Sequence, residues 1–226
     1  MKKAAVMFAF AVGAAGLFGA QNLRAEMFMI DAAHSDVGFS VRHMVVSKVR
    51  GSFSGLAGNF DYTENKPELW KASATNEIAS INTNNSKRDE HLRNPDFFDA
   101  EKFPIMTFVG EKAEMKEGKY MLPGTLTMHG VAKPVTLEIM PGGVIKDMRG
   151  GMRAGFEAKT MINRKDFGLT YNKVLETGGV AVSEEVEISI NIEGVTEKKM
   201  EMPKSEKSET PKMEKSMEKP AEKKGK

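Results

Sequence analysis

Four histidines are the side chains of this sequence with the most versatile chemistry, because imidazole binds metals and moves protons near neutral pH. They are His34, His43, His91 and His129. Zinc and copper sites commonly take two ligands from one element, spaced as His-x-His or His-x3-His. The nearest pair, His34 and His43, is nine residues apart, and such residues in a strand face opposite sides about 30 Å apart. The chain also has no cysteine, so we predict no metal site.

A group near the N-terminus contains the residue types of a hydrolase triad. Asp31, His34 and Ser35 supply an acid, a base and a hydroxyl. Three residues so close in an extended chain cannot line up as acid, base and nucleophile, and the sequence lacks Gly-x-Ser-x-Gly. We interpret His34 and Ser35 as hydrogen-bonding to a neighbouring loop. The sequence also lacks a phosphate loop and a dinucleotide fingerprint, so we assign no catalytic residue and no cofactor.

The segment NNSKRDEHLRNPDFFDAEKFP, residues 84–104, is dense in charge and then abruptly aromatic. We expect helical turns at about 86–100, in a chain that otherwise has the pattern of strands. Asp89 and Asp99 would need a cleft and a suitable separation to act as general acid and base. As part of a polar cluster that locks a lid or plug they need only neighbouring polar groups, and we favour this interpretation. The predicted cluster consists of Arg88, Asp89, His91 and Asp99.

The elements that must position these residues are mostly β-strands, because apolar residues recur with a period of two. In residues 183–194, Val186, Ile188, Ile190 and Ile192 alternate with polar residues, which is typical of an antiparallel strand with one solvent-exposed face. The same alternation is found at 36–44, 70–78, 122–128, 135–140 and 152–162. Pro-Gly-Gly at 141–143 is expected to separate two runs. About eight strands at this spacing predict an all-β meander, sandwich or barrel.

Many side chains at the inward positions of these strands are large and conformationally adaptable, in a chain with 13 Phe and 17 Met. The simplest interpretation is a hydrophobic core. An eight-stranded up-and-down barrel, however, has an interior wide enough for one small ligand, and Met and Phe suit a deformable apolar cavity. Composition alone does not distinguish a filled interior from a hollow one.

The N-terminal residues 1–25 have the pattern of a secretory signal. Lys2 and Lys3 form a basic region, an apolar stretch follows to about Ala20, and small residues offer cleavage after Ala20 or Ala25. An uncleaved anchor is the alternative, since the stretch approaches the ~20 residues that span a bilayer. We expect a cleaved signal, because the stretch is only weakly hydrophobic.

The C-terminal residues 197–226 are expected to be a disordered tail. Lys, Glu, Met, Ser and Pro dominate, and such a segment cannot bury enough surface to offset the entropy of ordering. The tail carries ten Lys and seven Glu, a net charge of +3, and the three basic residues before Glu26 add another +3. Since the whole chain has a net charge of +2, residues 26–196 carry about −4. An acidic domain with interleaved charges does not indicate nucleic-acid binding.

Five segments, in this order, resemble the YceI family of exported lipocalin-like proteins. They are IDAAHSDVGFSVRHM (30–44), GSFSGLAGNF (51–60), INTNNSKRDEHLRNPDFFDAEKFPIMTF (81–108), GTLTMHGVAKPVTL (124–137) and INRKDFGL (162–169). The most specific motif is Arg-Asp-x-His-Leu-Arg-x-x-Asp-Phe-Phe-Asp followed by Phe-Pro. Gly-x-Leu-Thr-x-x-Gly-Val-x-x-Pro-Val is a second marker. The resemblance covers roughly residues 27–195.

This resemblance implies an all-β fold, an extended eight-stranded antiparallel lipocalin-like barrel over 26–196 with one short helical segment at about 86–100. It also implies a long apolar pore, a possible homodimer and a periplasmic location. Family members hold polyisoprenoid chains or other long amphiphiles, including quinone-like and fatty-amide molecules, and have no established catalytic residues. We therefore expect a periplasmic carrier for a polyisoprenoid, quinone-like or fatty-acyl molecule, and not an enzyme.

In this barrel Phe97 and Phe98 would enter the interior from the helical segment, and His43 would meet a polar head group, a water molecule or a core partner. The residues expected to line the ligand pocket are Phe39, Val41, His43, Phe53, Phe60, Phe97, Phe98, Phe108, Leu126, Phe156, Ile162 and Phe167. Two rival functions stay open at this point. One is an envelope stress-response or structural protein whose interior is only a core. The other is a lipid-modifying enzyme.

Overall fold

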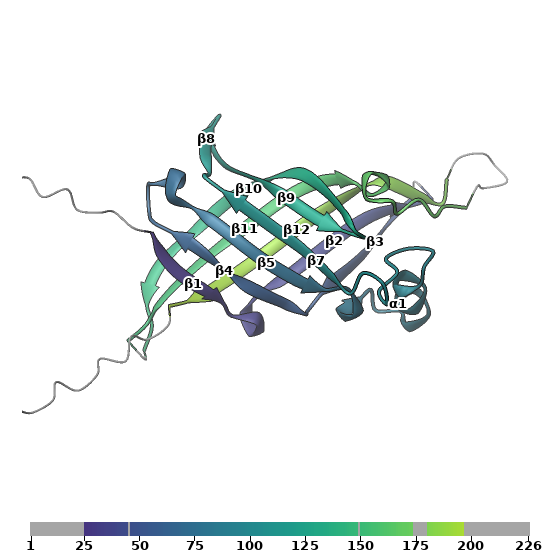
Figure 1. Cartoon of the computed structure of the whole chain (residues 1–226), viewed down its shortest axis with the longest axis horizontal. Coiled ribbons are helices and arrows are strands. Elements are labelled where there is room, and N and C mark those ends of the chain that lie inside the picture. The colour runs from purple at the N-terminus through teal and green to yellow at the C-terminus, as the bar shows by residue number, and fades with distance from the viewer. Residues whose placement is uncertain (1–24, 45, 149, 174–179, 197–226) are drawn as a thin grey trace, which may run out of the picture.

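The computed structural model describes residues 25–44, 46–148, 150–173 and 180–196. The predicted export signal, apart from Ala25, and the predicted tail therefore lie outside the described residues. The described chain forms an elongated antiparallel barrel, and its only α-helix among these residues, α1 (Ser86–Arg93), lies at one end of it (Figure 1). No helix in the described ranges is both long and apolar enough to cross a bilayer.

Eight strands close the barrel, as predicted, and two of them are interrupted. The first is divided by the 3-10 turn η1 (Ala32–His34) into β1 (Glu26–Ile30) and β2 (Asp36–His43). The second is divided into β3 (Ser47–Phe53) and β4 (Leu56–Tyr62). The other six are β5 (Lys71–Glu77), β7 (Ile105–Glu111), β9 (Lys119–Met128), β10 (Val131–Lys146), β11 (Met152–Asn163) and β12 (Val182–Val195). Each pairs with its neighbour in chain order, and β12 closes the ring by pairing with both β2 and β1.

The remaining elements are short and lie at the margins of the ring. β6 (Ile81–Asn82) extends the edge of β3, and β8 (Glu114–Lys116) forms a tight hairpin with β9. The hairpin turns at Glu117 and Gly118, whose φ angles are both positive, as a two-residue turn of this hand requires. The 3-10 turns η2 (Pro67–Leu69), η3 (Ile78–Ser80) and η4 (Arg164–Phe167) connect strands at the barrel ends.

The prediction that Pro-Gly-Gly separates two strands was wrong. β10 continues through Pro141, and the pairing with β11 shifts register between Pro141 and Gly143. Pro141 has no N–H to donate to the ladder, and Gly143 adopts a φ of 94°, so the strand accommodates both as a bulge rather than ending.

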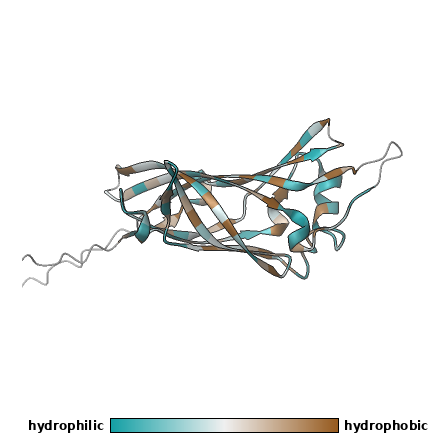
Figure 2. Ribbon diagram, turned by 90° about the horizontal axis from the view of Figure 1, so that it is seen from above, coloured by the Kyte–Doolittle hydropathy of each residue, from teal (hydrophilic) through white to brown (hydrophobic). Residues whose placement is uncertain are grey.

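The inner face of the barrel carries most of the buried apolar residues of the strands. Apolar and polar residues alternate along the strands in the ribbon of Figure 2. In β12, Ile188 lies opposite Phe39 of β2 and Thr160 of β11, and Ile190 lies opposite Val37 and Ala158. Residues directly opposite one another on antiparallel strands share a face. The period-two pattern of residues 183–194 therefore determines which side chains of its neighbours meet in the interior.

The buried apolar side chains form two clusters along the barrel. One, here the Trp70 cluster, contains Phe28, Phe60, Tyr62, Trp70, Ala113, Leu122, Leu137, Ile139, Ala154 and Ala158. The other, here the Phe167 cluster, contains Phe53, Ile78, Ile81, Met106, Met128, Ile162, Phe167 and Leu169. Leu92 of α1 and Phe98 pack against the Phe167 cluster. The Phe167 cluster is thus at the end of the barrel that the α1 segment covers.

The predicted helical segment at 86–100 is helical only in its first half. Asn85 caps the N-terminus of α1 through its side-chain oxygen, which accepts from the Arg88 N–H at 3.1 Å. The helix ends at Arg93, since Asn94 adopts an extended conformation ahead of Pro95. Residues 95–102 continue as turns, with Asp99 at a φ of 49°.

Candidate functional site

The interior of the barrel contains a cavity of about 240 Å³ with an almost entirely apolar wall. It extends from Tyr62 and Trp70 in one cluster to Phe53 and Leu169 in the other, and every strand of the closed ring contributes to its wall. Because β5 presents only Ala72 and Ala74 on this part of its inner face, the space is not filled from that side. The interior is therefore partly hollow.

Most of the residues predicted to line a ligand pocket do lie at this cavity. They are Phe39, Val41, Phe53, Phe60, Phe97, Phe98, Phe108, Leu126, Phe156 and Ile162. His43 is half-buried at the end of β2, between Ser47 and Val182, and does not line the cavity. Phe167 is only 2% exposed but packs within its cluster, outside the cavity wall. That any of these residues contacts a ligand stays a prediction.

Aromatic rings line the end of the cavity that is remote from α1. Phe156 contacts Phe60 edge-on with ring centroids 4.4 Å apart, and contacts Tyr62 at 5.5 Å. Trp70 lies between Tyr62 and Tyr120, and its indole N–H donates to the Thr63 carbonyl at 2.8 Å. Burial raises the pKa of the Tyr62 phenol, which keeps it neutral. This end therefore offers a ligand apolar and aromatic surface.

The α1 segment covers the opposite end with a second group of rings. Phe98 meets Phe53 edge-on at 5.8 Å, inside the barrel. Phe97 packs against His91 at 5.0 Å and Tyr171 at 4.8 Å, and His91 also contacts Tyr171. Both phenylalanines line the cavity. The Asp-Phe-Phe-Asp motif thus contributes two rings to one end of the cavity.

The predicted polar cluster is divided into separate groups. Asp89 and Arg88 do not form an ion pair with each other, and both instead bind Thr83, at the end of β6. His91 contacts the Asp96 carboxylate at 3.2 Å. Asp99 lies beyond the end of the helix, and its backbone rather than its side chain makes the hydrogen bonds in this segment. The members are apart because α1 is too short to bring residue 99 onto the face of residues 88 and 89.

Two further arginines, which sequence reasoning missed, bind carbonyl groups at this end. Arg93 donates to the carbonyls of Ala79 and Ile81, both at 3.0 Å. Arg164 is only 4% exposed and donates to the carbonyls of Leu169, Val182 and Ser183.

These bonds are structural. Burial lowers the pKa of the Arg164 guanidinium, and the carbonyl dipoles offset part of that penalty. Its place in Ile-Asn-Arg-Lys-Asp-Phe was visible in the sequence, but two of its three partners, Val182 and Ser183, are 18 and 19 residues away along the chain.

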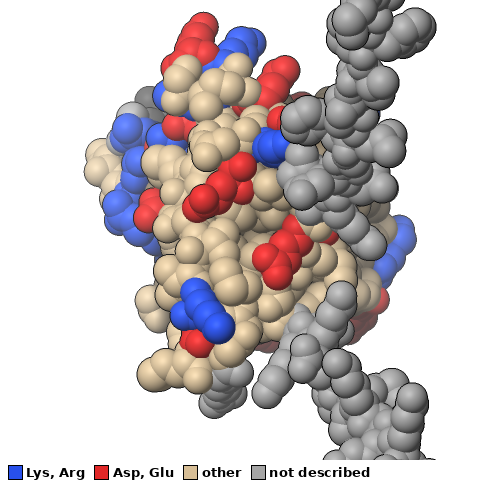
Figure 3. Space-filling view, turned by 90° about the vertical axis from the view of Figure 1, so that its left-hand side faces the viewer, with Lys and Arg blue, Asp and Glu red and all other residues tan. Residues whose placement is uncertain are grey.

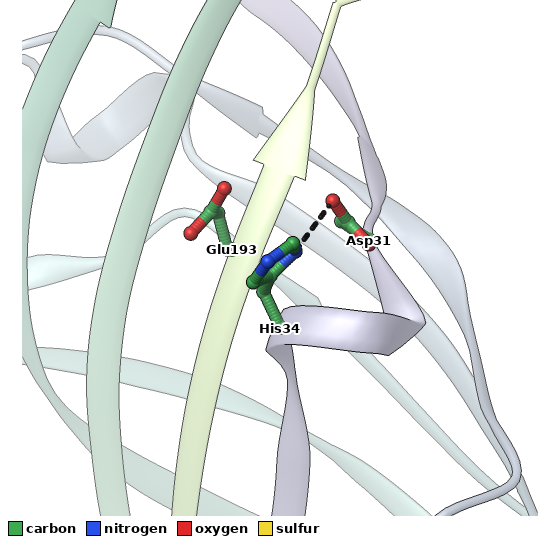
Figure 4. Close-up of side chains that lie close together, drawn as sticks. All are labelled: Asp31, His34 and Glu193. Carbon is green, nitrogen blue, oxygen red and sulfur yellow. Dashed lines mark hydrogen bonds and ion pairs between the residues drawn. The ribbon is translucent and has the colours of Figure 1, made fainter.

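Outside the cavity, Asp31, His34 and Glu193 gather at the junction of β1, η1 and β12 (Figure 4). Their ligand atoms lie within 4.8 Å of one another, a grouping that could hold a metal ion and that the histidine spacing had not predicted. The Arg153 guanidinium already pairs with both carboxylates. This positive charge satisfies the acids and opposes a bound cation, so the cluster is best described as an ion-pair network.

The interpretation of Ser35 needs one correction. Its hydroxyl donates to the Glu193 carbonyl at 3.2 Å and accepts from the Glu193 N–H at 3.0 Å, so its partner is strand β12 rather than a loop. His34 binds Asp31 within its own turn at 2.9 Å. The hydrogen bond from His34, together with Arg153, lowers the pKa of the Asp31 carboxyl. With Ser35 and His34 bound to different partners, the three residues do not form a catalytic triad.

The end of the barrel shown in Figure 3 carries interspersed acidic and basic side chains, without a large patch of one sign on this face. Ion pairs on the barrel exterior include Lys48 with Glu187 at 2.7 Å and Lys165 with Glu184 at 2.5 Å.

A closed antiparallel barrel with a hollow apolar interior defines the class of lipocalin-like binding proteins. Within this class the chain belongs to the YceI family, since the model described as YceI-like domain matches residues 28–194. Protein YceI of Salmonella agona is 37% identical over 200 residues, covering 88% of this chain and 100% of the relative.

Solved structures agree with this assignment. The Campylobacter jejuni YceI protein is 36% identical, with a TM-score of 0.60 and coverage of 74% of this chain and 96% of its own. A polyisoprenoid binding domain from Saccharophagus degradans has a TM-score of 0.54 over 77% of this chain and all of its own. Its 15% identity shows a likeness of fold alone.

Proposed function

We propose that this protein binds one long-chain amphiphile in the barrel and carries it in the periplasm. The observation that carries the proposal is the apolar cavity between the Trp70 and Phe167 clusters. Membership of the YceI family supports it, as does the polyisoprenoid that the name of the Saccharophagus domain gives as that domain's ligand. A polyisoprenoid, a quinone-like molecule or a fatty-acyl chain would each match the wall in chemistry.

The energetics of the proposed binding come from burial of apolar surface. Transfer of such surface from water contributes about 25 cal/mol per Å², from which the loss of ligand freedom must be subtracted. The cavity of about 240 Å³ is slightly smaller than the ~300 Å³ at which sites for drug-sized molecules begin. A long chain would therefore have to displace flexible side chains such as Phe97. Specificity for chain width should be loose, because apolar walls discriminate weakly.

The proposed periplasmic location, the absence of chemical conversion and the proposed homodimer each rest on a different observation. The periplasmic location follows from the signal-like pattern of residues 1–25. We propose carriage without chemical conversion because the wall is almost entirely apolar and because Asp31, His34 and Ser35, which lie outside it, do not form a triad. A homodimer is a proposal from the family resemblance, and sedimentation of the purified protein would test it.

The proposal is tested by native mass spectrometry of protein purified from the periplasm without detergent, with solvent extraction of any bound mass. A discrete prenyl or acyl adduct, at one per barrel, is the expected result. The delipidated protein is then titrated with a polyprenol. A protein that carries no adduct and binds no polyprenol or fatty amide would overturn the proposal in favour of a filled structural core.

A matched pair of variants places binding inside the barrel. Ala74 faces the cavity from β5, whereas its neighbour Ser73 is exposed on the outer face. Ala74→Phe should fill the cavity and weaken binding by about tenfold or more, because a few lost methylene contacts are worth roughly 1–3 kcal/mol. Ser73→Phe adds the same ring outside and should leave binding unchanged. Equal effects of the two would place the lipid on the exterior.

A further inference from the structure

Asn76 is a polar residue on the inner face of β5, at the cavity. Along this strand Ala72, Ala74 and Asn76 point inward, and Asn76 is only 4% exposed. In the pairing register it lies opposite Leu56 on β4 and Met106 on β7. Both neighbours are buried and apolar, so the carboxamide lies between an aliphatic and a thioether side chain, on a residue that lines the cavity.

Both polar groups of this carboxamide are unmatched. Neither the side-chain oxygen nor the side-chain nitrogen of Asn76 has a hydrogen-bond partner among the described residues. Buried polar groups are nearly always paired, because an unmade hydrogen bond in an apolar environment is costly. An amide here thus destabilises the empty barrel relative to an apolar residue of the same size.

The other buried polar groups that line the cavity differ from Asn76 in this respect. The Arg164 guanidinium donates to three backbone carbonyls, and the indole N–H of Trp70 donates to Thr63. Their polar atoms are used in holding the barrel ends together. The polar atoms of Asn76 make no such bond, although the residue lines the space that the ligand is proposed to occupy.

We propose that Asn76 is a specificity-determining residue that selects a chain whose polar group both donates and accepts a hydrogen bond. A carboxamide, a hydroxyl or a protonated carboxyl group can accept from the Asn76 nitrogen and donate to its oxygen. An ester or a quinone carbonyl can only accept, and a hydrocarbon end does neither. This inference rests on the proposed function and narrows its ligand to amphiphiles with such a group.

The position of Asn76 also determines the direction in which the chain is bound. Met106 belongs to the Phe167 cluster, and Ile78, two residues beyond Asn76, belongs to it as well. The polar group of the ligand therefore lies toward the end that α1 covers. Its hydrocarbon part extends toward the rings of Phe156 and Trp70, where the wall is aromatic.

The test compares three chains of equal length that differ only in their polar group. Oleamide both donates and accepts, methyl oleate only accepts, and 9-octadecene does neither. Each displaces N-phenyl-1-naphthylamine from delipidated full-length protein. Wild type should bind oleamide about tenfold tighter than methyl oleate, since one additional hydrogen bond between neutral groups is worth up to about a factor of ten. In Asn76→Leu the two affinities should differ by less than about threefold.

Control variants separate the possible outcomes. Asn191→Leu makes the same substitution at an exposed position on β12 and should keep the wild-type ratio. Asn76→Ala serves as a second variant and should also lose the preference.

Equal ratios in wild type and both Asn76 variants would overturn the role of Asn76 while leaving chain binding intact. Failure of all three chains and of a polyprenol to displace the dye from wild type would instead overturn the proposed function.

Discussion

The Asp89 carboxylate accepts two hydrogen bonds from Thr83, one from its backbone N–H at 2.9 Å and one from its hydroxyl at 2.5 Å. Asp89 is on α1 and Thr83 directly follows β6, so this pair connects the helix to the barrel end. Both residues are buried. Arg88 donates to the hydroxyl and the carbonyl of the same threonine. The position of α1 over the cavity therefore depends on Thr83 rather than on ion pairs within the helix.

Replacement of Asp89 by alanine should lower the free energy of unfolding by about 2–3 kcal/mol, because the buried Thr83 N–H and hydroxyl lose a charged acceptor. Chemical denaturation measures this change. Asp99→Asn is the control, since the Asp99 side chain makes no hydrogen bond within the described residues and Asn tolerates its positive φ. The control should change stability by less than about 0.5 kcal/mol. A similar loss in both variants would contradict the assigned role of Asp89.

Replacement of Asn76 by leucine should stabilise the ligand-free protein by about 1–2 kcal/mol, because two unmatched polar groups leave an apolar environment. The side chains are similar in size, so repacking between Leu56 and Met106 should be small. Thermal unfolding of delipidated protein measures the effect, with Asn191→Leu as the exposed control. A destabilised Asn76→Leu would show that the carboxamide is satisfied by some other group and would remove the basis of its proposed role.

The bound chain should place its tail near Trp70, the only tryptophan of the sequence. Trp70 and Asn76 are six residues apart along β5 and its start, a separation of roughly 20 Å. An octadecanamide brominated at its last carbon should therefore quench Trp70 fluorescence more strongly than one brominated beside the carboxamide. Asn76→Leu should weaken this difference. Stronger quenching by bromine beside the carboxamide would mean that the chain binds in the opposite direction.

Gly58 on β4 should not tolerate alanine. Its φ is 146°, and an added Cβ would lie 2.1 Å from the backbone carbonyl oxygen of Ser73 on β5. Separation of the paired strands would be required, so we expect a loss of more than about 2 kcal/mol. Gly118→Ala is the matched control, because its φ is also positive but its Cβ meets nothing within 4 Å. It should lose only about 1 kcal/mol. Equal losses would show that backbone conformation alone determines both effects.

Acid should weaken the junction of β1 and β12 through Asp31. The hydrogen bond from His34, with a contribution from Arg153, lowers the pKa of this carboxyl from its ordinary value of 3.8. The folded state therefore holds the ionised form more tightly than the unfolded state does. The resulting stabilisation is complete well above pH 3.8 and is lost as the pH falls through the lowered folded-state pKa.

Urea midpoints measured between pH 6 and pH 2.5 test this dependence. Asp31→Asn cannot ionise and should show a shallower loss at acid pH than wild type. Glu138→Gln is a comparison in a separate group of ion pairs, where Lys119 and Lys159 lower the pKa of Glu138 in the same direction. Identical acid profiles of wild type and Asp31→Asn would exclude a contribution from Asp31.

The strand pattern could be predicted because it is local. Val186, Ile188, Ile190 and Ile192 alternate with polar residues, and this period is sufficient to assign the inner face of β12 without knowledge of its partners. The rings of Phe97 and Phe98 are adjacent in a motif whose composition already contrasts with its surroundings. The same reasoning failed at Pro141, because a bulge depends on the neighbouring strand and not on the proline alone.

The polar contacts could not be predicted, because their partners come from distant parts of the chain. Ser35 is 158 residues from its partner Glu193, and Arg153 is 122 residues from Asp31. His43 was expected at the pocket because it lies on the same side of the strand as Phe39 and Val41, but it is the last residue of β2 and does not line the cavity. The alternation of residues shows which side of a strand faces inward, but it does not show how far along the strand the cavity extends.

The sequence by itself determined the family through motifs of consecutive residues, and the resemblance to that family implied the eight-stranded barrel. Short-range periodicity alone determined the all-β class and the apolar character of the inner face. Only the tertiary structure decided that the interior is partly hollow, that Thr83 anchors α1, and that Asn76 lines the cavity with its carboxamide unpaired. These properties depend on which side chains of different strands meet. Packing and hydrogen bonding depend on which residues are neighbours in space. Residues from distant strands become neighbours only when the barrel closes.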